Sequence, residues 1–526
     1  MSKPIDFDHA AHVTSKWTHA LLIAAISTVP VILILLAMGN GPGISPDSVS
    51  YASAAQSLSA GEGFLDFTGE QQATYAPGLS LHYAGLLALG VPLDIAVVAT
   101  NILALIATTA LVYLIAAGVG LSRYLVIAST VLTVWNRTTV EVFSMLWSEV
   151  LFVPVTLAAV LLLVTAWSRR SLSWAIATSV ALLLSVGVSL RYAGAFFALG
   201  VTLASLTIPR PRWRTKILQT GLLGVVPAVT LLIVAFINVI NGSDPFGDRY
   251  PSQRSLIGAL ESMLDGLGTT LVWRGSIGVT IVIGTAALIL ALVGTWIAVV
   301  NRQATQVLAV TAFVYLGALL WSQSDPRLAH GAERLGYPAW PLIVIITISI
   351  VPILITTTRR QLAMRWAQQQ RLSKFGPPAA ITFVVVSIAL LGSLNAYRYA
   401  TDGRENGIGY ARLDVRSTEA AALIVDIPTN AVITSNEPWL VAWLRPDVTS
   451  IPLPPSAQEW PEARISKDVA RIRTYLETGS IIYGLSIPES HASWSIDDFR
   501  TNGITVEQLT QDTATNSPEV FVLRLP

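Results

Sequence analysis

Eleven stretches of apolar residues constrain the fold of this chain more than any other feature. A helix that crosses a bilayer needs about 20 predominantly apolar residues. Ten of the stretches suit such a helix, and the only charge inside them is Glu149. An eleventh, residues 124–135, is short, and we count it as a span because the charged loops require it. The ten are residues 17–38, 95–117, 148–168, 171–190, 192–208, 217–240, 277–300, 307–321, 337–357 and 381–396.

The composition agrees with a chain that lies mostly in a membrane. Charged residues make up 12% of the sequence and the mean hydropathy is +0.60, whereas soluble domains carry roughly 25% charged residues. The 33 Lys and Arg nearly cancel the 32 Asp and Glu, and we find no basic stripe, so nucleic acid is not a predicted partner. The absence of cysteine excludes disulfides, thiolate catalysis and cysteine-ligated metals.

The distribution of basic residues predicts the orientation, because cytoplasmic loops are enriched in Lys and Arg. Eleven crossings place the N-terminus in the cytoplasm, with the basic segments at Lys3 and Lys16, 169–170, 210–216, Arg302 and 359–374. They place residues 39–93, 137–147, 241–274, 322–336 and everything after Tyr397 outside. Residues 1–16 have no clear cleavage site, so the first stretch is predicted to be an uncleaved anchor. The apolar segment 78–90 is too short to cross and is predicted to be an interfacial helix.

The C-terminal part has a different composition. Residues 401–526 are charged and carry strand patterns at 431–434, 480–483 and 520–525, and helix patterns at 417–425 and 467–477. No GxGxxG motif is present, so a dinucleotide site is not expected. The predicted fold class is therefore a polytopic α-helical membrane protein with about eleven transmembrane helices in residues 1–400. A small extracytoplasmic α/β domain follows in residues 401–526.

The first outer loop, residues 39–93, carries the most informative motif. Pro46 and Asp47 indicate the start of a helix that Asp47 can cap. Tyr51, Ala54 or Ala55, and Leu58 then fall on one face, as in an amphipathic helix that lies on a membrane. Gly61 and Gly63 are predicted to end the helix, and residues 75–78 (Tyr-Ala-Pro-Gly) form a turn into the next one.

Each of these residues also has a purely structural interpretation. Asp47 can serve as a helix cap and nothing more, and Tyr51 as an interface aromatic. Outer arginines can extend to lipid headgroups. Glu149 is either a second active-site carboxylate or the structural partner of Arg191, and His82 is more typical of a packing residue than of a metal ligand.

The loop resembles that of the GT-C glycosyltransferases, in particular the protein mannosyltransferase and lipid A aminoarabinose transferase families. Those enzymes place an Asp in the first extracytoplasmic loop, followed by Tyr, a helix of small residues ending in Gly, and a Pro-Gly turn. Many relatives have Asp-Glu where this chain has Asp47-Ser48. Weaker similarities occur at Ser148-Glu149, 190–194, 333–341 and 426–436.

The resemblance implies a fold, an activity and a set of site residues. It implies a sugar donor linked to a polyprenyl phosphate, an acceptor on a glycan, lipid or protein, and contact with membrane lipids. Asp47 would be the catalytic residue. Departure of the sugar builds negative charge on the phosphate, which cations stabilise. The donor phosphate would be bound by Arg191, Arg249 and Arg334, with Arg254 and Arg327 also in outer loops, and substrates would contact Tyr51, Tyr75, Glu149, Tyr192 and Tyr337.

Two further predictions concern cofactors and alternative functions. Some relatives accommodate a divalent metal, but the first loop has no cluster of ligands, so no metal or other cofactor is predicted. A transporter or flippase for a lipid-linked sugar would also suit scattered outer arginines, although such proteins place charges at mid-span on broken helices. A binding or assembly module on a membrane anchor would leave the number of spans unexplained.

Overall fold

The computed structural model describes residues 16–209, 213–247, 255–271, 277–301, 303–324, 334, 336–351, 376–429, 431–454, 462–487, 494–508 and 519–525. Each of the eleven predicted apolar stretches contains a helix. These helices are α1 (Lys16–Ala37), α4 (Leu93–Gly118), α5 (Arg123–Val134), α7 (Glu149–Ser168), α8 (Trp174–Leu190), α9 (Gly194–Ser205), α10 (Trp213–Ile240), α12 (Ile277–Val300), α13 (Thr305–Ser324), α15 (Trp340–Ser349) and α17 (Gly376–Asn406).

Within the described residues, six helices are long and apolar enough to cross a membrane: α1, α4, α7, α10, α12 and α13. Four shorter apolar helices accompany them, including α5 and α8. Prolines lie inside α1, α7 and α10, where neighbouring helices and local adjustments can satisfy the freed backbone groups. The chain is a polytopic helical membrane protein, and a total of about eleven crossings stays a prediction.

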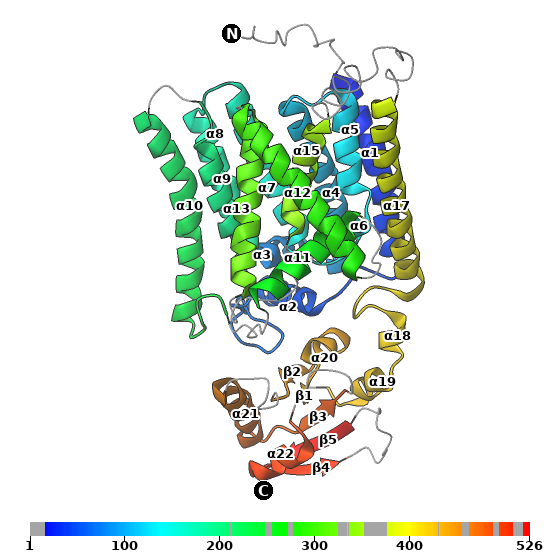
Figure 1. The fold of residues 1–526 in the computed structure, drawn as a ribbon. Coiled ribbons are helices and arrows are strands. Elements are labelled where there is room, and N and C mark those ends of the chain that lie inside the picture. The colour runs from blue at the N-terminus through cyan, green and yellow to red at the C-terminus, as the bar shows by residue number, and fades with distance from the viewer. Residues whose placement is uncertain are drawn as a thin grey trace, which may run out of the picture.

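Four additional helices lie in the half of the bundle nearest the C-terminal sheet (Figure 1). They are α2 (Pro46–Ala60), α3 (Gly78–Ala88), α6 (Arg137–Ser144) and α11 (Leu256–Leu271). The expected short helix in residues 78–90 is confirmed as α3. The predicted stop at Gly61 is also confirmed, because this residue ends α2 in the left-handed conformation, with φ 79°.

The buried face of α2 corrects the expectation of a helix lying on the membrane surface. Tyr51, Ala54 and Ala55 do share a face, but all three are buried. Tyr51 and Ala55 join the core of the bundle together with Leu79 of α3. Small side chains allow this close packing. The helix that carries Asp47 is therefore fixed by protein contacts.

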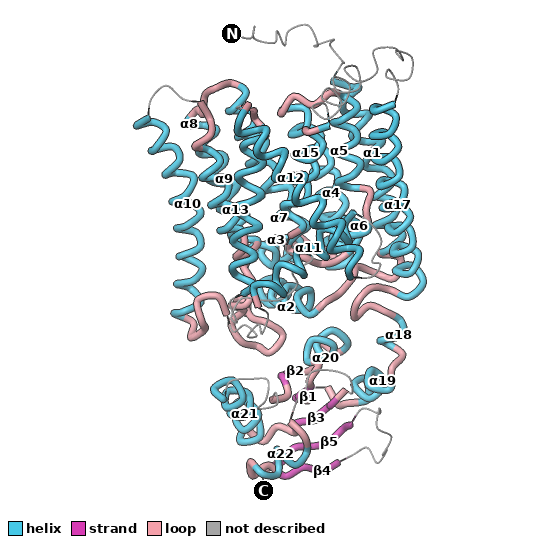
Figure 2. The backbone as a smooth tube through the Cα atoms, viewed as in Figure 1, coloured by secondary structure: helices cyan, strands magenta, loops and turns pink. Residues whose placement is uncertain are grey.

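The C-terminal part contains a five-stranded sheet (Figure 2). The strand order is β2-β1-β3-β5-β4; β1 pairs in parallel with β2 and β3, and β5 pairs antiparallel with β3 and β4. Three of the strands confirm the sequence predictions within two or three residues. The elements are β1 (Val432–Ser435), β2 (Thr449–Pro452), β3 (Ile482–Ser486), β4 (Thr505–Gln508), β5 (Glu519–Arg524), α18 (Leu413–Arg416), α19 (Glu419–Asp426), α20 (Pro438–Leu444), α21 (Glu462–Glu477) and α22 (Ile496–Thr501).

The sheet-containing part contacts the first loop of the bundle. The rings of Phe67 and Trp439 lie 6.0 Å apart between their centroids, and Arg471 of α21 forms an ion pair with Glu70. The N-terminal end of α1 lies at the opposite end of the bundle (Figure 1). The first loop and the sheet therefore share one end of the molecule.

Three short segments pair as a parallel ladder at this end; we call residues 43–44, 144–146 and 408–410 the three-segment ladder. Parallel bridges join Gly43 to Met145 and Ile44 to Gly409. The amide of Gly43 donates to the Ser144 carbonyl at 2.8 Å. The ladder connects the first loop, the segment that precedes α7, and the segment that leads into the sheet.

Candidate active site

The start of α2 places Asp47, and it differs from the prediction in one respect. Ser45, not Asp47, is the N-cap: its hydroxyl accepts from the Ser48 amide, and the Ser48 hydroxyl accepts from the Ser45 amide at 3.0 Å. The expected cap at Asp47 is wrong because Pro46 occupies the first helical turn, where its fixed φ is favourable and its missing N–H costs nothing. The Asp47 side chain is thereby available for other contacts.

Tyrosines of the first loop surround the Asp47 carboxylate. The Tyr75 hydroxyl donates to Asp47 Oδ1 at 2.6 Å, and the Tyr51 ring packs on Tyr75 with centroids 5.0 Å apart. Burial and the neighbouring carboxylate both raise the pKa of Tyr75. Tyr75 therefore stays protonated and acts as a hydrogen-bond donor that orients Asp47.

Glu149 begins α7 and is almost completely buried, with 1% of its side chain exposed. It pairs with the Arg191 guanidinium, and its Oε1 lies 3.4 Å from Arg334 Nε. Burying a carboxylate is costly unless it is paired and hydrogen-bonded. The sequence left open whether Glu149 is the structural partner of Arg191 or a carboxylate of the active site. In the structure it pairs with Arg191 and also lies among the candidate site residues.

Arg191 follows the last residue of α8 in an extended conformation. Its Nη1 lies 3.5 Å from the Ser148 hydroxyl, and its side chain is 11% exposed. A tight turn follows, in which the Gly194 amide donates to the Arg191 carbonyl at 2.8 Å. A Cβ at Gly194 would lie 2.6 Å from the carbonyl oxygen of Gly187, so only glycine lets the chain fold back here into α9.

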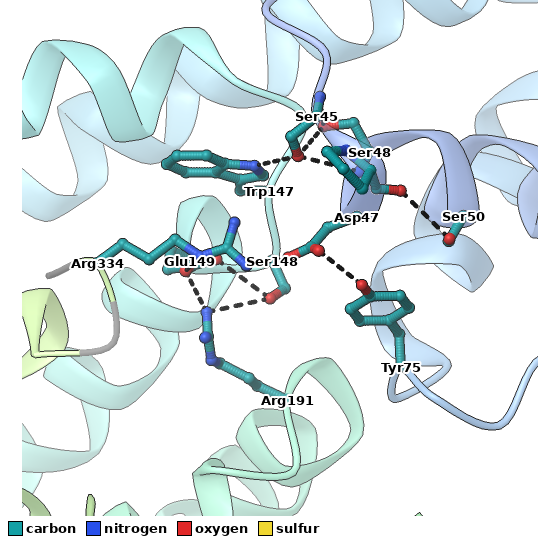
Figure 3. Close-up of polar contacts among 11 residues, drawn as sticks. Ser45, Asp47, Ser48, Ser50, Tyr75, Trp147, Ser148, Glu149, Arg191 and Arg334 are labelled. Atoms are coloured by element: carbon teal, nitrogen blue, oxygen red, sulfur yellow. Dashed lines mark hydrogen bonds and ion pairs between the residues drawn. The ribbon is translucent and has the colours of Figure 1, made fainter. Parts of the chain in front are cut away.

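Arg334 completes the cluster from the segment before α15. Its guanidinium forms an ion pair with Asp47 and lies over the Trp147 ring, 4.5 Å from the ring centroid. Trp147 in turn donates from Nε1 to the Ser45 hydroxyl at 2.8 Å. Figure 3 shows the Asp47, Glu149, Arg191 and Arg334 side chains directed toward one another.

The charges of this cluster set the protonation of Asp47. Burial alone would raise its pKa, but the Arg334 guanidinium and the Tyr75 hydrogen bond outweigh that effect and hold the pKa below its ordinary value. Asp47 is therefore an ionised carboxylate at neutral pH. Among the described residues, the cluster consists of the carboxylates of Asp47 and Glu149 and the guanidinium groups of Arg191 and Arg334, and we call it the four-charge cluster. Its two negative and two positive formal charges cancel.

Two contributors lie outside the set predicted from sequence. Trp147 precedes the Ser-Glu pair, and an aromatic residue at the outer end of a span ordinarily indicates only an interface position. Tyr315 of α13 is fully buried and close enough to Arg191 to interact electrostatically. In the sequence, the one feature that could have indicated this position is a tyrosine within the otherwise apolar stretch 307–321.

The remaining predicted residues lie elsewhere or outside the described residues. Tyr192 donates to the Ala73 carbonyl at 2.9 Å, so it supports the first loop. Tyr337 is buried with its hydroxyl 2.8 Å from that of Thr139, and His82 contacts Thr100. These hydrogen bonds of Tyr192 and Tyr337 go to residues outside the four-charge cluster. The predicted phosphate ligand Arg249, with Arg254 and Arg327, lies outside the described residues.

The described residues contain no group of three or more His, Asp or Glu side chains arranged to hold a metal ion. Both carboxylates of the cluster, Asp47 and Glu149, are instead paired with arginines. The arrangement offers one carboxylate that can accept a proton and two cations that can bind an anion.

No protein-family model matches the chain, and a comparison with curated protein sequences finds no relative. Similar solved structures do exist. ArnT from Cupriavidus metallidurans in the apo state matches with a TM-score of 0.57 and 10% identity, over 97% of this chain and 98% of that one. The same protein bound to undecaprenyl phosphate gives a TM-score of 0.56, also at 10% identity and the same coverage.

A third similar structure comes from an archaeon. The oligosaccharyltransferase AglB from Archaeoglobus fulgidus, in complex with an inhibitory peptide and a dolichol-phosphate, matches with a TM-score of 0.52 and 12% identity. The match covers 91% of this chain and 70% of that one. All of these proteins belong to the GT-C superfamily. At such low identity the similarity concerns the fold, and the chain has the GT-C fold that its first-loop motif predicts.

Proposed function

We propose that this protein is an inverting glycosyltransferase. It moves a hexose or pentose from a polyprenyl-phosphate donor to an acceptor hydroxyl on a glycan, lipid or protein of the cell envelope. The observation that carries the proposal is the convergence of two carboxylates, one of them the candidate base, and two arginines from four distant parts of the chain. The ArnT structure with undecaprenyl phosphate and the AglB structure with dolichol-phosphate support the choice of donor.

Asp47 is the general base in this proposal. Its carboxylate accepts the proton of the acceptor hydroxyl while the hydroxyl oxygen attacks the anomeric carbon of the donor sugar. The bond between that carbon and the phosphate oxygen breaks on the opposite side, and its electron pair stays on the phosphate. One displacement forms one glycosidic bond and inverts the configuration, and no nucleotide takes part.

Arg191 and Arg334 stabilise the departing phosphate. Its negative charge grows as the sugar leaves, and preorganised cations lower the energy of that transition state. The donor brings one negative charge into a cluster whose formal charges cancel, and the product phosphate carries a second negative charge while Asp47 becomes neutral. The total charge of the site is then unchanged during the chemical step.

The site faces away from the cytoplasm in this proposal. The four-charge cluster includes Asp47 at the start of α2, which lies at the end of the bundle nearest the sheet, opposite the N-terminal end of α1 (Figure 1). The positive-inside pattern predicts a cytoplasmic N-terminus, so the cluster and residues 401–526 would both lie outside. A transporter or flippase would need charges near mid-span, and this location favours the enzyme.

The decisive experiment uses the Asp47→Asn variant of the full chain in lipid nanodiscs. The substrates are polyprenyl-phosphate sugars with a radiolabelled sugar, supplied with an extract of cell-envelope acceptors. Loss of transfer, with unchanged gel-filtration behaviour and melting temperature, is the expected result. Asp66→Asn is the matched control: Asp66 lies in the same loop and accepts from Thr68 at 2.6 Å. Retained turnover in Asp47→Asn would exclude Asp47 as the base.

A second experiment separates donor use from acceptor use. Arg191→Ala should raise the donor KM more than the acceptor KM, because it removes a phosphate ligand. Arg191→Lys keeps the charge but not the planar fork of donors, and it should give an intermediate donor KM. A donor KM that is the same in all three proteins would show that Arg191 has only a structural role.

A further inference from the structure

Residue 409 lies where no side chain fits. Gly409 has a φ of 60°, in the left-handed region, and it pairs in parallel with Ile44. A Cβ built at this position would collide with the carbonyl oxygen of Ile44. That oxygen belongs to the backbone, which cannot move aside as a flexible side chain can. Residue 409 must therefore be glycine for the two segments to approach this closely.

The pairing is made by two backbone hydrogen bonds. The Ile44 amide donates to the Ile408 carbonyl at 3.3 Å, and the Tyr410 amide donates to the Ile44 carbonyl at 2.8 Å. Ile44 is 1% exposed. Both backbone polar groups of Ile44 are thus satisfied by the segment that leads into the sheet.

The position of Ile44 determines where α2 begins. Ile44 directly precedes the N-cap Ser45, and Asp47 lies in the first turn of the helix. A displacement of Ile44 relative to residues 408–410 would therefore shift the helical turn that carries Asp47. Misplacing a catalytic group by about 1 Å can reduce the rate about 10²-fold.

Residues 144–146, on the opposite side of the three-segment ladder, support Glu149 without involving residue 409. Residues 144–146 run directly into Trp147 and Glu149, and Leu146 donates to the Gly43 carbonyl at 3.1 Å. Buried Asn101 of α4 donates to the carbonyl oxygens of Phe143 and Met145, each at 2.9 Å. Glu149, and with it Arg191, therefore has an anchor in α4 that does not involve residue 409.

We propose that Gly409 is a positioning residue for Asp47. Its bare α-carbon lets residues 408–410 bind Ile44 closely enough to fix the start of α2, and with it the distance from Asp47 to the acceptor. The role as a determinant of catalysis rests on the proposed function. It makes the connection between the bundle and the sheet part of the active site's framework, acting through Asp47 and not through contact with substrate.

Gly409→Ala is the direct test, in the full chain in nanodiscs. We expect kcat to fall about 10- to 100-fold. The affinity for polyprenyl phosphate alone should change less than about threefold, because Glu149 and its partner Arg191 do not depend on residue 409, and Arg334 is also held by Glu149 and the Trp147 ring. A simple loss of folded protein would lower kcat and phosphate binding together, so it would not produce this difference. Unchanged kcat, or equal losses in kcat and in phosphate affinity, would overturn the proposal.

Two control variants separate the steric contact from backbone strain. Gly479 has a φ of 81°, and no atom of the described residues lies within 4 Å of a Cβ built there, so Gly479→Ala introduces the strain alone and should keep wild-type kcat. Asn tolerates left-handed conformations but has a Cβ, so Gly409→Asn should be as defective as Gly409→Ala. Full activity in Gly409→Asn would contradict the steric argument.

Hydrogen exchange gives a readout that is independent of activity. In Gly409→Ala, the amides of Ile44 and Tyr410 should exchange faster, whereas that of Leu146 should keep its protection. If the wild-type protein transfers no sugar, the proposed function fails, but this measurement still tests the pairing. Unchanged exchange at Ile44 and Tyr410 would overturn it.

A milder variant covers the case in which Gly409→Ala does not fold. The half-buried Asn40 donates from its side chain to the Arg404 carbonyl at 2.6 Å and so connects the same two parts of the chain. Asn40→Ala adds no steric conflict. We expect faster exchange at Ile44 and about a threefold fall in kcat. Wild-type exchange and kcat in this variant would argue against the proposal.

Discussion

Asp47 and Arg334 form an ion pair across 287 residues of sequence. The same guanidinium lies beside Glu149 and over the Trp147 ring. The candidate base is therefore held by the cation that is proposed to receive the donor phosphate. This relationship connects proton transfer with phosphate binding, and it leads to predictions about pH, hydrogen bonding and stability.

The pH dependence of transfer should report the Asp47–Arg334 pair. Asp47 must be ionised to accept a proton, so kcat/KM should fall as the pH drops through its pKa, which lies below the ordinary value of 3.8. Arg334→Gln removes the cation, and burial then raises the pKa of Asp47. The acid limb of the kcat/KM profile should therefore move to higher pH. Arg137→Gln, which alters a different arginine–glutamate pair, should leave the limb in place.

Tyr75→Phe should weaken catalysis without unfolding the protein. The substitution removes the 2.6 Å hydrogen bond to Asp47 but keeps the ring that packs on Tyr51. A hydrogen bond to a charged group contributes about 1.5–3 kcal/mol, which corresponds to a fall in kcat of roughly 10- to 100-fold. Tyr337→Phe, which among the described residues breaks the hydroxyl contact with Thr139, should give wild-type kinetics. A reduced substrate affinity in Tyr337→Phe would instead restore its predicted role in binding.

Glu149→Gln should destabilise the protein more than Asp47→Asn does. Glu149 is 1% exposed and lies against two guanidinium groups, whereas Asp47 is 19% exposed. Removing one partner of a buried ion pair leaves the other charge uncompensated, at a cost of about 3–5 kcal/mol. Chemical denaturation in detergent, followed by intrinsic fluorescence, measures the difference. Equal stability of the two variants would mean that water reaches Glu149 and Arg191.

Trp147 should contribute to catalysis through two contacts, its hydrogen bond to Ser45 and its cation–π contact with Arg334. Trp147→Phe keeps an aromatic ring beneath Arg334 but loses the hydrogen bond to Ser45, so a fall of about tenfold in kcat is expected. Trp147→Ala also removes the cation–π contact and should raise the KM for the donor as well. Steady-state kinetics with varied donor concentrations distinguish these two effects. Identical kinetics for the two variants would exclude a contribution from the ring.

The helices were the most predictable part of the fold. Long uncharged runs leave a chain no alternative in a membrane, so each apolar stretch contains a helix. Helices α6 and α11 were not predicted, because the count of crossings assigned residues 137–147 and 241–274 to outer loops and no helix was sought there. The three strands predicted in the C-terminal part were found because alternating and β-branched residues mark them clearly.

The site was predictable in its residue types and less so in its contacts. The first-loop motif indicated Asp47 and Tyr75, and the rule that intramembrane charges need partners indicated Glu149 and Arg191. The Asp47–Arg334 pair joins two distant segments, so no local pattern encodes it. The cap was misassigned because Asp and Ser are similarly good N-caps, and only the position of Pro46 distinguishes them. The single-residue bridge at Gly409 leaves no periodic signal.

The three-segment ladder also has a consequence for the order in which the candidate site can assemble during synthesis. Ile44 leaves the ribosome early, but its hydrogen-bonding partners at residues 408 and 410 are made only after every helix of the bundle. Until then the backbone groups of Ile44 lack these bonds, and the start of α2 is held only from the side of residues 144–147 among the contacts described above. The order of translation thus delays assembly of the complete site until the bundle has been inserted and the C-terminal segment has crossed to the same side.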